Sequence, residues 1–306
     1  MSAVVVLGVF VADVTFRADR LPRIGETILG RDFALGPGGK GSNQAVACGR
    51  AGGAVAILTR LGRDAFGAMA REVWSGAGVT PLVTEGAAPT GSAFIYVDAA
   101  SGDNAIIVAP GAGGELSPAD IDAQAAAIAG ARVAVTQLEQ PMDAAMRFLG
   151  VARAGGAATV LNPAPAAALP EGMLSLCDYV TPNESEAEAL TGIAVTDLEG
   201  ARAAADALLA AGVGRAVLVT LGARGVLFHS AERSVHVPAF DAGPVVETTG
   251  AGDAFNGAFA ASLSEGRDPV EAARFGCAAA AISVTRPGAA ASSPERAEIE
   301  ALLAKG

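Results

Sequence analysis

The chain has 306 residues, of which 51% are hydrophobic and 17% are charged, and its formal net charge is −11. This composition excludes a generally disordered chain, because disordered chains combine low hydrophobicity with high charge. The acidic balance argues against nucleic acid or an anionic membrane as the main partner, since both favour basic surfaces. At about 150 residues per domain the length fits one large domain or two. We find no linker and expect one domain over residues 1–306.

Three features concern the cellular setting. The longest uncharged stretch, residues 154–170, is broken by glycines and prolines, so we expect no transmembrane helix. The first residues lack the basic segment of a signal peptide. Cys48, Cys177 and Cys277 are widely spaced and odd in number, which does not suggest a disulfide framework. We therefore expect a soluble, cytoplasmic protein.

Short β-branched runs alternate with longer alanine-rich amphipathic stretches. This pattern is typical of an α/β fold with a doubly wound, mainly parallel sheet flanked by helices. It predicts buried strands at 4–7, 56–58, 133–135, 159–161, 179–180 and 217–219. It predicts helices at 42–51, 64–77, 117–129, 142–154, 184–190, 201–211, 253–264 and 270–284.

Two segments interrupt the alternation. Residues 27–35 and 92–97 are predicted strands with no helix between them and their neighbours, and the second continues through a polar turn into 106–108 as a hairpin. We therefore expect a small antiparallel flap, assembled from residues 13–35 and 91–108 and projecting from the core. Its strand 94–96 is apolar, and an exposed apolar strand is an aggregation hazard. The sequence thus predicts a homodimer through the flap strands.

A first glycine cluster, residues 36–43, precedes a predicted helix, so its amides can approach a ligand at the helix N-terminus. Its spacing also satisfies G-x-G-x-x-G, the fingerprint of dinucleotide-binding folds. That interpretation needs an acidic residue at the end of the next strand, where this chain has Arg60. The cluster is not a Walker A loop either, because Gly41 follows Lys40 where Ser or Thr is required.

A second cluster ends in Asp253, at the start of an apolar helix. The amides of Gly250, Ala251 and Gly252 would point into the mouth of this helix and form an anion hole that the helix dipole reinforces. Asp253 has an alternative explanation as a simple helix cap. A helix that needs only a cap, however, does not need glycine at both Gly250 and Gly252. A third cluster, residues 220–225, follows a strand and could face a nucleotide's phosphates or ribose.

With these motifs the chain resembles the PfkB-type carbohydrate kinases, and within them the ribokinases. Residues 38–45 (GGKGSNQA) match the first family signature, and residues 247–255 (ETTGAGDAF) match the second. Between them lie, in the family's order, QLE at 137–139, LNPAP at 161–165, TPNESEAE at 181–188 and TLG at 220–222. The resemblance covers essentially the whole chain and implies a doubly wound core with a lid.

The resemblance implies transfer of the ATP γ-phosphoryl group to a primary hydroxyl of a sugar, with D-ribose becoming D-ribose 5-phosphate. Such transfers pass through a loose, in-line transition state, so the site must position both partners and neutralise charge. It implies that Asp253 is the general base that accepts the hydroxyl proton. It also implies that the amides of Gly250, Ala251 and Gly252 hold the transferring phosphoryl group.

The pair Asn183 and Glu186 has two interpretations. An Asn followed three residues later by Glu is typical of a capping box at a helix start. The resemblance instead implies a role near Mg²⁺ and the phosphates, with Glu186 acting through coordinated water. Cys277, which the resemblance places near the adenine, could equally be a packing residue. The ATP-binding residues that the resemblance implies are Asn183, Glu186, Thr220, Gly222, Arg224, Gly225, Gly252 and Cys277.

The sugar site implied by the resemblance draws on polar residues, as binding of a polyol requires. Taken singly, Glu139 could be a surface acid and Lys40 a solvated lysine. Val11 stands where ribokinases usually carry Asn, and an unpaired sugar hydroxyl there would cost about 1–3 kcal/mol. A sugar lacking or inverting one hydroxyl, or a nucleoside, is therefore an alternative substrate. The implied sugar-binding positions are Val11, Asp13, Gly39, Lys40, Asn43, Glu139 and Asp253.

Family members of this type also bind a monovalent cation, K⁺, beside the anion hole, partly through backbone carbonyls. The matching positions are Glu247, Thr249, Ser283, Arg286, Gly288 and Ser292. Glu247 replaces the usual Asp and is one methylene longer, and it could also be a solvent-facing strand residue. Two rival functions stay open: a kinase of the same fold for a nucleoside, fructose or a keto-deoxy sugar acid, and a non-catalytic regulator that binds sugar or nucleotide.

Overall fold

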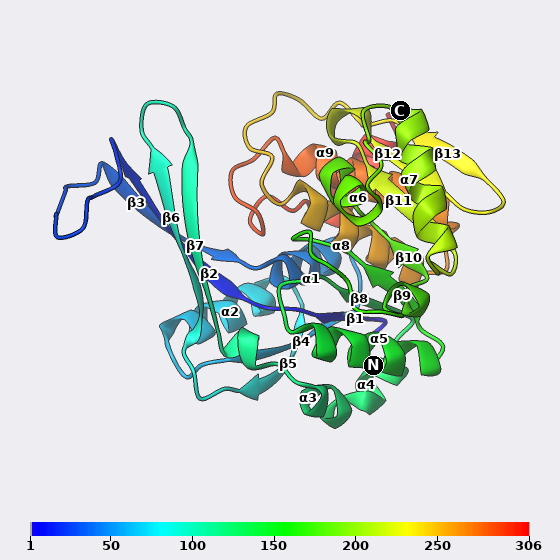
Figure 1. Ribbon diagram of the computed structural model, residues 1–306, viewed down its shortest axis with the longest axis horizontal. Coiled ribbons are helices and arrows are strands. Elements are labelled where there is room, and N and C mark those ends of the chain that lie inside the picture. The colour runs from blue at the N-terminus through cyan, green and yellow to red at the C-terminus, as the bar shows by residue number, and fades with distance from the viewer. Residues whose placement is uncertain (1, 306) are drawn as a thin grey trace.

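The computed structural model describes residues 2–305 and contains two sheets, a large central one and a small one that projects from it (Figure 1). The strands of the large sheet are β1 (Val4–Leu7), β4 (Val55–Leu61), β5 (Thr80–Glu85), β8 (Val133–Thr136), β9 (Ala158–Leu161), β10 (Tyr179–Val180), β11 (Ala216–Thr220), β12 (Val226–His229) and β13 (Ser234–Val237). Their order is β13-β12-β11-β10-β9-β8-β1-β4-β5. All pairs are parallel except β11–β12 and β12–β13, so the doubly wound, mainly parallel sheet is confirmed.

Helices cover both faces of this sheet, which explains why its strands are nearly continuous apolar runs. Side chains alternate along β1: Val4 and Val6 join one hydrophobic core, and Val5 and Leu7 join the other. The first core includes residues of α1 (Lys40–Arg50), α2 (Ala65–Gly76), α8 (Ala251–Ser264), α9 (Pro269–Ser283) and α10 (Arg296–Leu303). The second includes residues of α3 (Pro118–Ala123), α4 (Ala125–Ala129), α5 (Met142–Ala154), α6 (Glu184–Thr191) and α7 (Leu198–Ala210). Short 3₁₀ helices occupy Ala112–Glu115, Leu174–Leu176 and Gly222–Arg224.

The six predicted core strands are all present, and the eight predicted helical regions are helical. The region 117–129 is divided at Gln124 into two short helices, α3 and α4. Strand β5 and helix α10 were not expected, and β12 and β13 form a hairpin outside the six predicted core strands. Strand β5 is an edge strand with only exposed or half-buried residues, so it lacks a strong apolar pattern. Within residues 2–305 no helix is long and apolar enough to cross a membrane, and Cys48, Cys177 and Cys277 are buried and unpaired.

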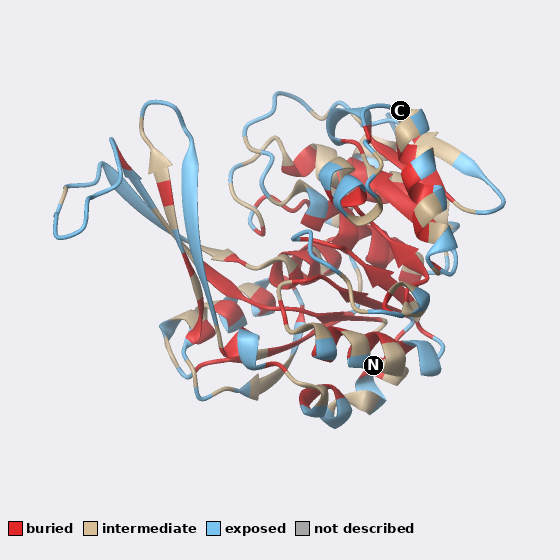
Figure 2. Cartoon of the chain, viewed as in Figure 1, coloured by how far each residue is buried: buried red, intermediate tan, exposed pale blue. Residues whose placement is uncertain are grey.

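The small sheet, called the flap below, contains β2 (Val11–Ala18), β3 (Asp32–Gly38), β6 (Thr90–Asp98) and β7 (Asn104–Gly111) in the order β3-β2-β6-β7. The hairpin β6–β7 and the pair β2–β3 are antiparallel, whereas the central pair β2–β6 is parallel. The predicted strand 27–35 begins only at Asp32 and continues to Gly38. The flap extends away from the helices and is largely exposed (Figure 2).

Helices α1 and α8 pack with their backbones close together. A Cβ atom at Gly257 of α8 would lie 2.6 Å from the Cβ of Ala47 and 2.7 Å from the amide nitrogen of Cys48, both on α1. Real Cβ atoms do not approach other atoms this closely, so the contact requires glycine. The contact fixes the separation of two helices that both carry candidate site residues.

Candidate active site

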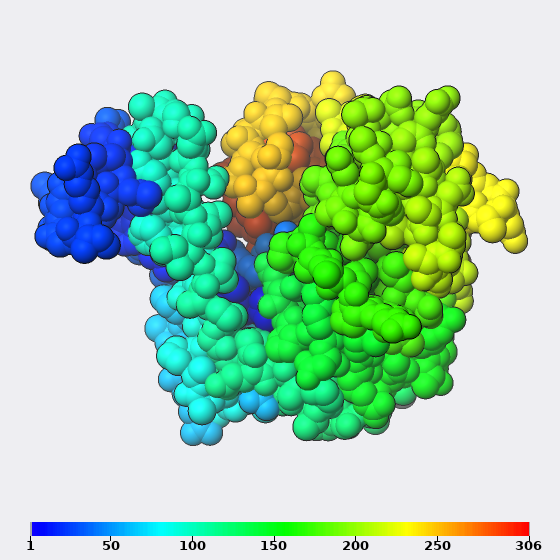
Figure 3. Space-filling view, viewed as in Figure 1, coloured from blue at the N-terminus to red at the C-terminus, as the bar shows by residue number. Residues whose placement is uncertain are grey.

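The candidate site lies where the order of the sheet reverses. The chain proceeds from β1 to β4 and β5 on one side, then returns to β8 on the other side of β1. In open α/β sheets such a switch point, at the carboxyl ends of the strands, is the usual place for a ligand. The flap leaves from the end of β1, and the surface is hollowed between the flap and the segment around residues 240–250 (Figure 3).

The start of α8 presents unpaired backbone amides. Gly250 is the N-cap residue with φ of 80°, a left-handed conformation that favours glycine, and no side chain caps the helix. The amide of Ala251 donates to the carbonyl oxygen of Thr248 at 3.2 Å, so it is already used. Within residues 2–305, the amides of Gly250, Gly252 and Asp253 have no protein acceptor. The amides available for the predicted anion hole are therefore these three, with that of Asp253 in place of that of Ala251.

The carboxylate of Asp253 is buried, with 7% of the residue exposed. Its Oδ2 accepts a hydrogen bond from Nδ2 of Asn43, and its Oδ1 accepts one from Nε2 of Gln44, both at 3.0 Å. Burial raises the pKa of Asp253, while the positive charge of Lys40 and the two amide donors oppose that rise. Gln44 was not among the predicted site residues, although it lies inside the first signature.

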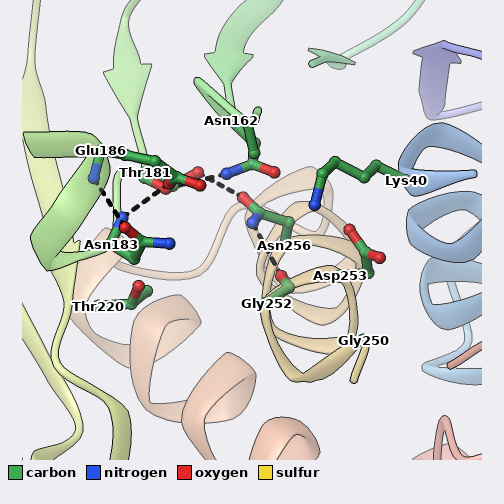
Figure 4. Close-up of a pocket in the computed structure, with 11 residues that line it drawn as sticks. Lys40, Asn162, Thr181, Asn183, Glu186, Thr220, Gly250, Gly252, Asp253 and Asn256 are labelled. Atoms are coloured by element: carbon green, nitrogen blue, oxygen red, sulfur yellow. Dashed lines mark hydrogen bonds between the residues drawn. The ribbon is translucent and has the colours of Figure 1, made fainter. Parts of the chain in front are cut away.

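A polar cavity of about 160 Å³ adjoins Asp253 (Figure 4). Lys40 and Asp253 lie on one side of it, and Asn183 and Glu186 lie on the other. Its lining residues are Lys40, Asn162, Ala164, Thr181, Asn183, Glu186, Thr220, Gly250, Gly252, Asp253 and Asn256. An enclosure with a lysine, two carboxylates and helix amides is suited to phosphate groups and an associated cation.

Asn183 and Glu186 form the capping box that the sequence suggested. Oδ1 of Asn183 accepts from the amide of Glu186 at 2.8 Å, and Oε2 of Glu186 accepts from the amide of Asn183 at 2.9 Å. The two interpretations are compatible, because both residues also line the polar cavity. Burial raises the pKa of Glu186, and the charge of Lys40 opposes this. One carboxylate facing a cavity that phosphates and water can share fits Mg²⁺, which keeps several water ligands.

A second, larger cavity of about 660 Å³ shares Asn183, Thr220 and Gly252 with the first. Most of its remaining wall is apolar, including Phe240 and Phe255, which suits a planar base. The predicted ATP-binding residues Thr220, Gly222, Gly225, Gly252 and Cys277 all line this cavity.

Cys277 and Arg224, both predicted to bind the nucleotide, differ in where their side chains lie. Cys277 lines the larger cavity but is buried, and burial raises the pKa of its thiol to about 12, so it contributes shape and not reactivity. Arg224 is not in the wall of either cavity. Its guanidinium donates to the carbonyl oxygen of Thr196 at 2.8 Å and to Glu184 at 3.3 Å. The prediction that Arg224 contacts ATP is therefore not supported by this geometry.

Three of the predicted sugar residues are connected to Asp253: Asn43 bonds it, Lys40 shares its cavity wall, and Glu139 bonds the amide of Lys40. Oε2 of Glu139 accepts from the backbone amide of Lys40 at 2.7 Å. Burial raises the pKa of Glu139, and the charges of Asp253 and Asp13 add to that rise. Oδ1 of Asn43 is buried and, within residues 2–305, has no protein donor. These groups are acceptors that sugar hydroxyls could use.

Burial dominates the protonation of the two outer carboxylates. It raises the pKa of Asp13 to about 6 and that of Glu139 to about 7, with Lys40 opposing the shift at Glu139. Asp13 is on strand β2 of the flap, while Glu139 follows β8 of the core. The predicted sugar residues thus come from both the flap and the core.

Gly39 and Val11 lie at the root of the flap. Gly39 has φ of 86°, and a Cβ there would lie 3.0 Å from the amide nitrogen of Val11. Val11 is 5% exposed and belongs to the hydrophobic core, so it offers no polar side chain at this place.

The predicted cation residues lie on two adjacent segments, 247–249 and 283–292. Oε2 of Glu247 accepts from the amide of Gly288 at 2.8 Å, which joins the segments. A Cβ at Gly250 would lie 2.7 Å from Cα of Ala289, so the second segment also contacts the start of α8. Glu247 is half-buried and its carboxylate connects the two segments, so it is not simply a residue that faces solvent.

The remaining cation positions differ in orientation. The hydroxyls of Ser283 and Ser292 donate to nearby backbone carbonyls and keep oxygen lone pairs. Thr249 is exposed. The guanidinium of Arg286 turns away to pair with Glu298, which leaves only its backbone carbonyl as a candidate ligand. Carboxylate, hydroxyl and carbonyl oxygens are suitable donors for K⁺.

Comparison with known proteins identifies the family of the chain. A model of the pfkB family of carbohydrate kinases matches residues 1–296. A ribokinase from Haemophilus influenzae is 40% identical over 96% of this chain and 95% of its own length. A deoxyribokinase from Salmonella typhi is 36% identical over 95% of each chain. The structure of Arabidopsis thaliana ribokinase complexed with ribose and ATP superposes with a TM-score of 0.94 at 31% identity, covering 99% of this chain and 98% of the other. The chain therefore belongs to the pfkB family of carbohydrate kinases.

Proposed function

We propose that the protein phosphorylates the primary hydroxyl of D-ribose with ATP to give D-ribose 5-phosphate. The observation that carries this proposal is the position of Asp253: a buried carboxylate that lies beside unpaired amides, lines the polar cavity and accepts a hydrogen bond from Asn43 of the proposed sugar site. The full-length relative named ribokinase and the related structure with ribose and ATP support the choice of both substrates.

Asp253 is the proposed general base. Its raised pKa makes it a stronger proton acceptor, while the amide donors from Asn43 and Gln44 keep the ionised form accessible. The sugar hydroxyl would lose its proton to this carboxylate as it attacks the γ-phosphorus. The amides of Gly250, Gly252 and Asp253 would then bind the transferring phosphoryl group, with little rearrangement because the helix holds them in place.

The two connected cavities suggest how ATP lies. The adenosine part fits the larger, mostly apolar cavity, and the shared wall of Asn183, Thr220 and Gly252 directs the phosphates toward Asp253. Lys40 lines the polar cavity together with Asp253, and its positive charge opposes the rise in the pKa of Asp253 that burial causes. The ammonium of Lys40 would also offset the phosphate charge.

Two cations belong to the proposal. Glu186 and Asn183 would hold Mg²⁺ through water, and Mg²⁺ would neutralise phosphate charge. Glu247, Ser292 and backbone carbonyls of the 283–292 segment would hold K⁺, whose charge would support the adjoining anion hole. Replacing K⁺ with Na⁺ in the assay should lower kcat if this site is used, and equal rates with both ions would exclude it.

The sugar would be held by Asp13, Gly39, Lys40, Asn43 and Glu139, with the flap closing over it. A second substrate, 2-deoxy-D-ribose, is favoured by one observation: the buried, apolar Val11 offers no hydrogen bond at the root of the flap. A relative of 36% identity is named deoxyribokinase.

We also propose a homodimer formed through the flap. By strand alternation and register, Phe16, Phe33, Phe94 and Ile107 share one face of the flap, and each is at least 37% exposed. The ring centroid of Phe16 lies 5.5 Å from that of Phe33 and 5.9 Å from that of Phe94. A second copy covering this face would remove a large apolar patch from water. The net charge of −11 favours small molecules over nucleic acid or membranes as other partners, and we propose a cytoplasmic setting.

The experiment that tests the main proposal measures ADP formation by the purified full chain with ribose, 2-deoxyribose, fructose and adenosine. We expect the highest kcat/KM with ribose, and phosphorus NMR should show a 5-phosphate monoester. A higher kcat/KM with another acceptor would replace ribose as the substrate. Absence of acceptor-dependent ADP formation would exclude a kinase.

A further inference from the structure

Gln44 of α1 occupies the centre of a buried amide network behind the candidate base. It is fully buried. Its Nε2 donates to Oδ1 of Asp253 and to Oδ1 of Asn162, both at 3.0 Å, and its Oε1 accepts from Nε2 of Gln137 at 2.6 Å. Asn162 in turn donates to the carbonyl oxygen of Thr181 at 3.1 Å. The network thus joins Asp253 of α8 to residues that follow β8, β9 and β10.

The direction of every hydrogen bond in this network follows from the charge of Asp253. An ionised carboxylate only accepts, so Gln44 must turn its NH₂ group toward Asp253. The second hydrogen of that group then reaches Asn162, and the carbonyl oxygen of Gln44 is left for the NH₂ group of Gln137. A residue with no donor at position 44 would leave the buried Oδ1 of Asp253 without this partner.

We propose that Gln44 is a positioning residue for phosphoryl transfer, which fixes the rotation of the Asp253 carboxylate and stabilises its ionised form. The inference rests on the proposed function of Asp253 as base. Asn43 donates to one carboxylate oxygen and Gln44 to the other, and the two residues are consecutive on α1. Two donors on one rigid helix hold the plane of the carboxylate, so its remaining lone pairs keep one direction toward the sugar hydroxyl.

The roles of the two donors differ. Asn43 also presents a buried Oδ1 that lacks a protein donor, and it belongs to the proposed sugar site. Gln44 has protein partners at both ends of its side chain and is absent from the cavity walls. Loss of Gln44 should therefore change proton transfer and leave binding of both substrates intact.

The test compares Gln44→Met, Gln44→Glu and the matched control Gln140→Met. Gln140 is a buried amide that bonds Thr136 and the backbone of Gln137 without contacting Asp253. The readouts are the pH profile of kcat, the KM values for ATP and ribose, and the pKa of Asp253. Carbon NMR of aspartate-labelled protein gives that pKa, with Asp253→Asn providing the assignment.

For Gln44→Met we expect the pKa of Asp253 and the acid limb of kcat to rise by about one pH unit, because a hydrogen bond to the charged form is lost. We expect kcat at neutral pH to fall about tenfold through loss of alignment, with both KM values unchanged. Gln44→Glu should raise the Asp253 pKa further, since it places a second carboxylate against the first. Gln140→Met should match the wild type in every readout.

An unchanged Asp253 pKa in Gln44→Met, or a fall in kcat matched by Gln140→Met, would overturn the inference. If Gln44→Met does not fold, Gln137→Met tests it, because it removes only the bond that orients Gln44. That variant should show a smaller rise in the Asp253 pKa, and no rise would overturn the inference. The NMR titration needs no turnover, so an inactive wild type would reject the proposed kinase activity separately.

Discussion

The carboxyl edge of the large sheet and the flap are built in opposite ways. At the sheet edge, polar side chains such as Asp253, Gln44 and Asn162 are buried and bonded to one another. In the flap, large apolar side chains such as Phe33 and Ile107 are exposed, and exposed residues make up much of the flap (Figure 2). The proposed catalytic groups therefore lie in a fully packed protein interior, whereas the flap proposed to close over the sugar has an apolar face that the single chain leaves exposed.

This difference predicts that substitutions in the two regions will have different effects. The core site is held by close packing and by a network with fixed directions, so a change there should affect turnover. The flap is held mainly by its hydrogen-bonded ladder and carries Asp13, one of the proposed sugar residues. A change there should affect assembly and sugar affinity before it affects the chemical step.

The largest effect is expected at the core. Asp253→Asn keeps the size of the side chain but removes the proton acceptor, so kcat should fall at least about 100-fold, with little change in ATP binding. Steady-state kinetics and ATP titration would measure this. The control is Asp206→Asn, which should retain activity. Asp206 is exposed, pairs with His229 and lines neither cavity. Near wild-type turnover of Asp253→Asn would reject the base assignment and the comparison drawn from it.

The next effect is expected in the flap. Phe94 and Ile107 are directly opposite each other on β6 and β7 and are 37% and 69% exposed. Replacing both with lysine should halve the sedimenting mass, because burying two charges in the dimer interface is unfavourable. Val246→Lys alters an equally exposed valine outside the flap and should leave the mass unchanged. A wild-type protein that sediments as a monomer at every concentration would exclude the flap dimer.

A smaller effect should appear in the pH dependence of sugar binding. Asp13 and Glu139 have pKa values raised to about 6 and about 7, and sugar hydroxyls that donate to them favour their ionised forms. Ribose affinity should rise about tenfold between pH 5.5 and pH 7.5, with proton release measurable by calorimetry in buffers of different ionisation enthalpy. Asp13→Asn combined with Glu139→Gln should remove this dependence. An affinity that is flat with pH in the wild type would contradict it.

The same two groups affect stability with the opposite sign. Because their pKa values are higher in the folded than in the unfolded protein, the folded protein binds more protons between about pH 4 and pH 7. Their contribution to the free energy of unfolding of the sugar-free protein therefore falls as the pH rises through this window. Ribose should reduce that loss.

The smallest effect is expected at the root of the flap. Val11→Asn adds a polar group where Val11 offers none, and the KM for ribose should fall about fivefold. The KM for 2-deoxyribose should change less if the new amide meets the 2-hydroxyl. Thermal unfolding must show that the buried Asn is tolerated. An unchanged KM for ribose would show that Val11 does not set sugar affinity.

The sequence was sufficient for most of the fold because strands such as 4–7 and 133–135 are continuous apolar runs separated by amphipathic helices. It was insufficient where the signal depends on distant parts of the chain. The parallel pairing of β2 with β6 joins segments about 80 residues apart, and local patterning does not encode strand direction.

The candidate site, too, could be predicted only in part from the sequence. Asp253, Asn43 and Glu186 lie in motifs whose residue types suggest chemistry. Gln44 lies in the same motif, but its importance comes from contacts with residues 118 and 209 positions away. Arg224 illustrates the converse, since its place in a glycine-rich turn suggested phosphate binding while its side chain points to Thr196.

The absence of a side chain at Gly257 has a consequence for engineering this enzyme. Lys40 and Asn43, two of the proposed sugar residues, are on α1, and the proposed base Asp253 is on α8. The missing methyl group at Gly257 sets the spacing between these two helices. Gly257→Ala would push α1 and α8 apart. The sugar hydroxyl and the carboxylate of Asp253 would then be misaligned, although no reactive group is changed. Selection for altered turnover could therefore yield substitutions on the face of α8 that packs against α1.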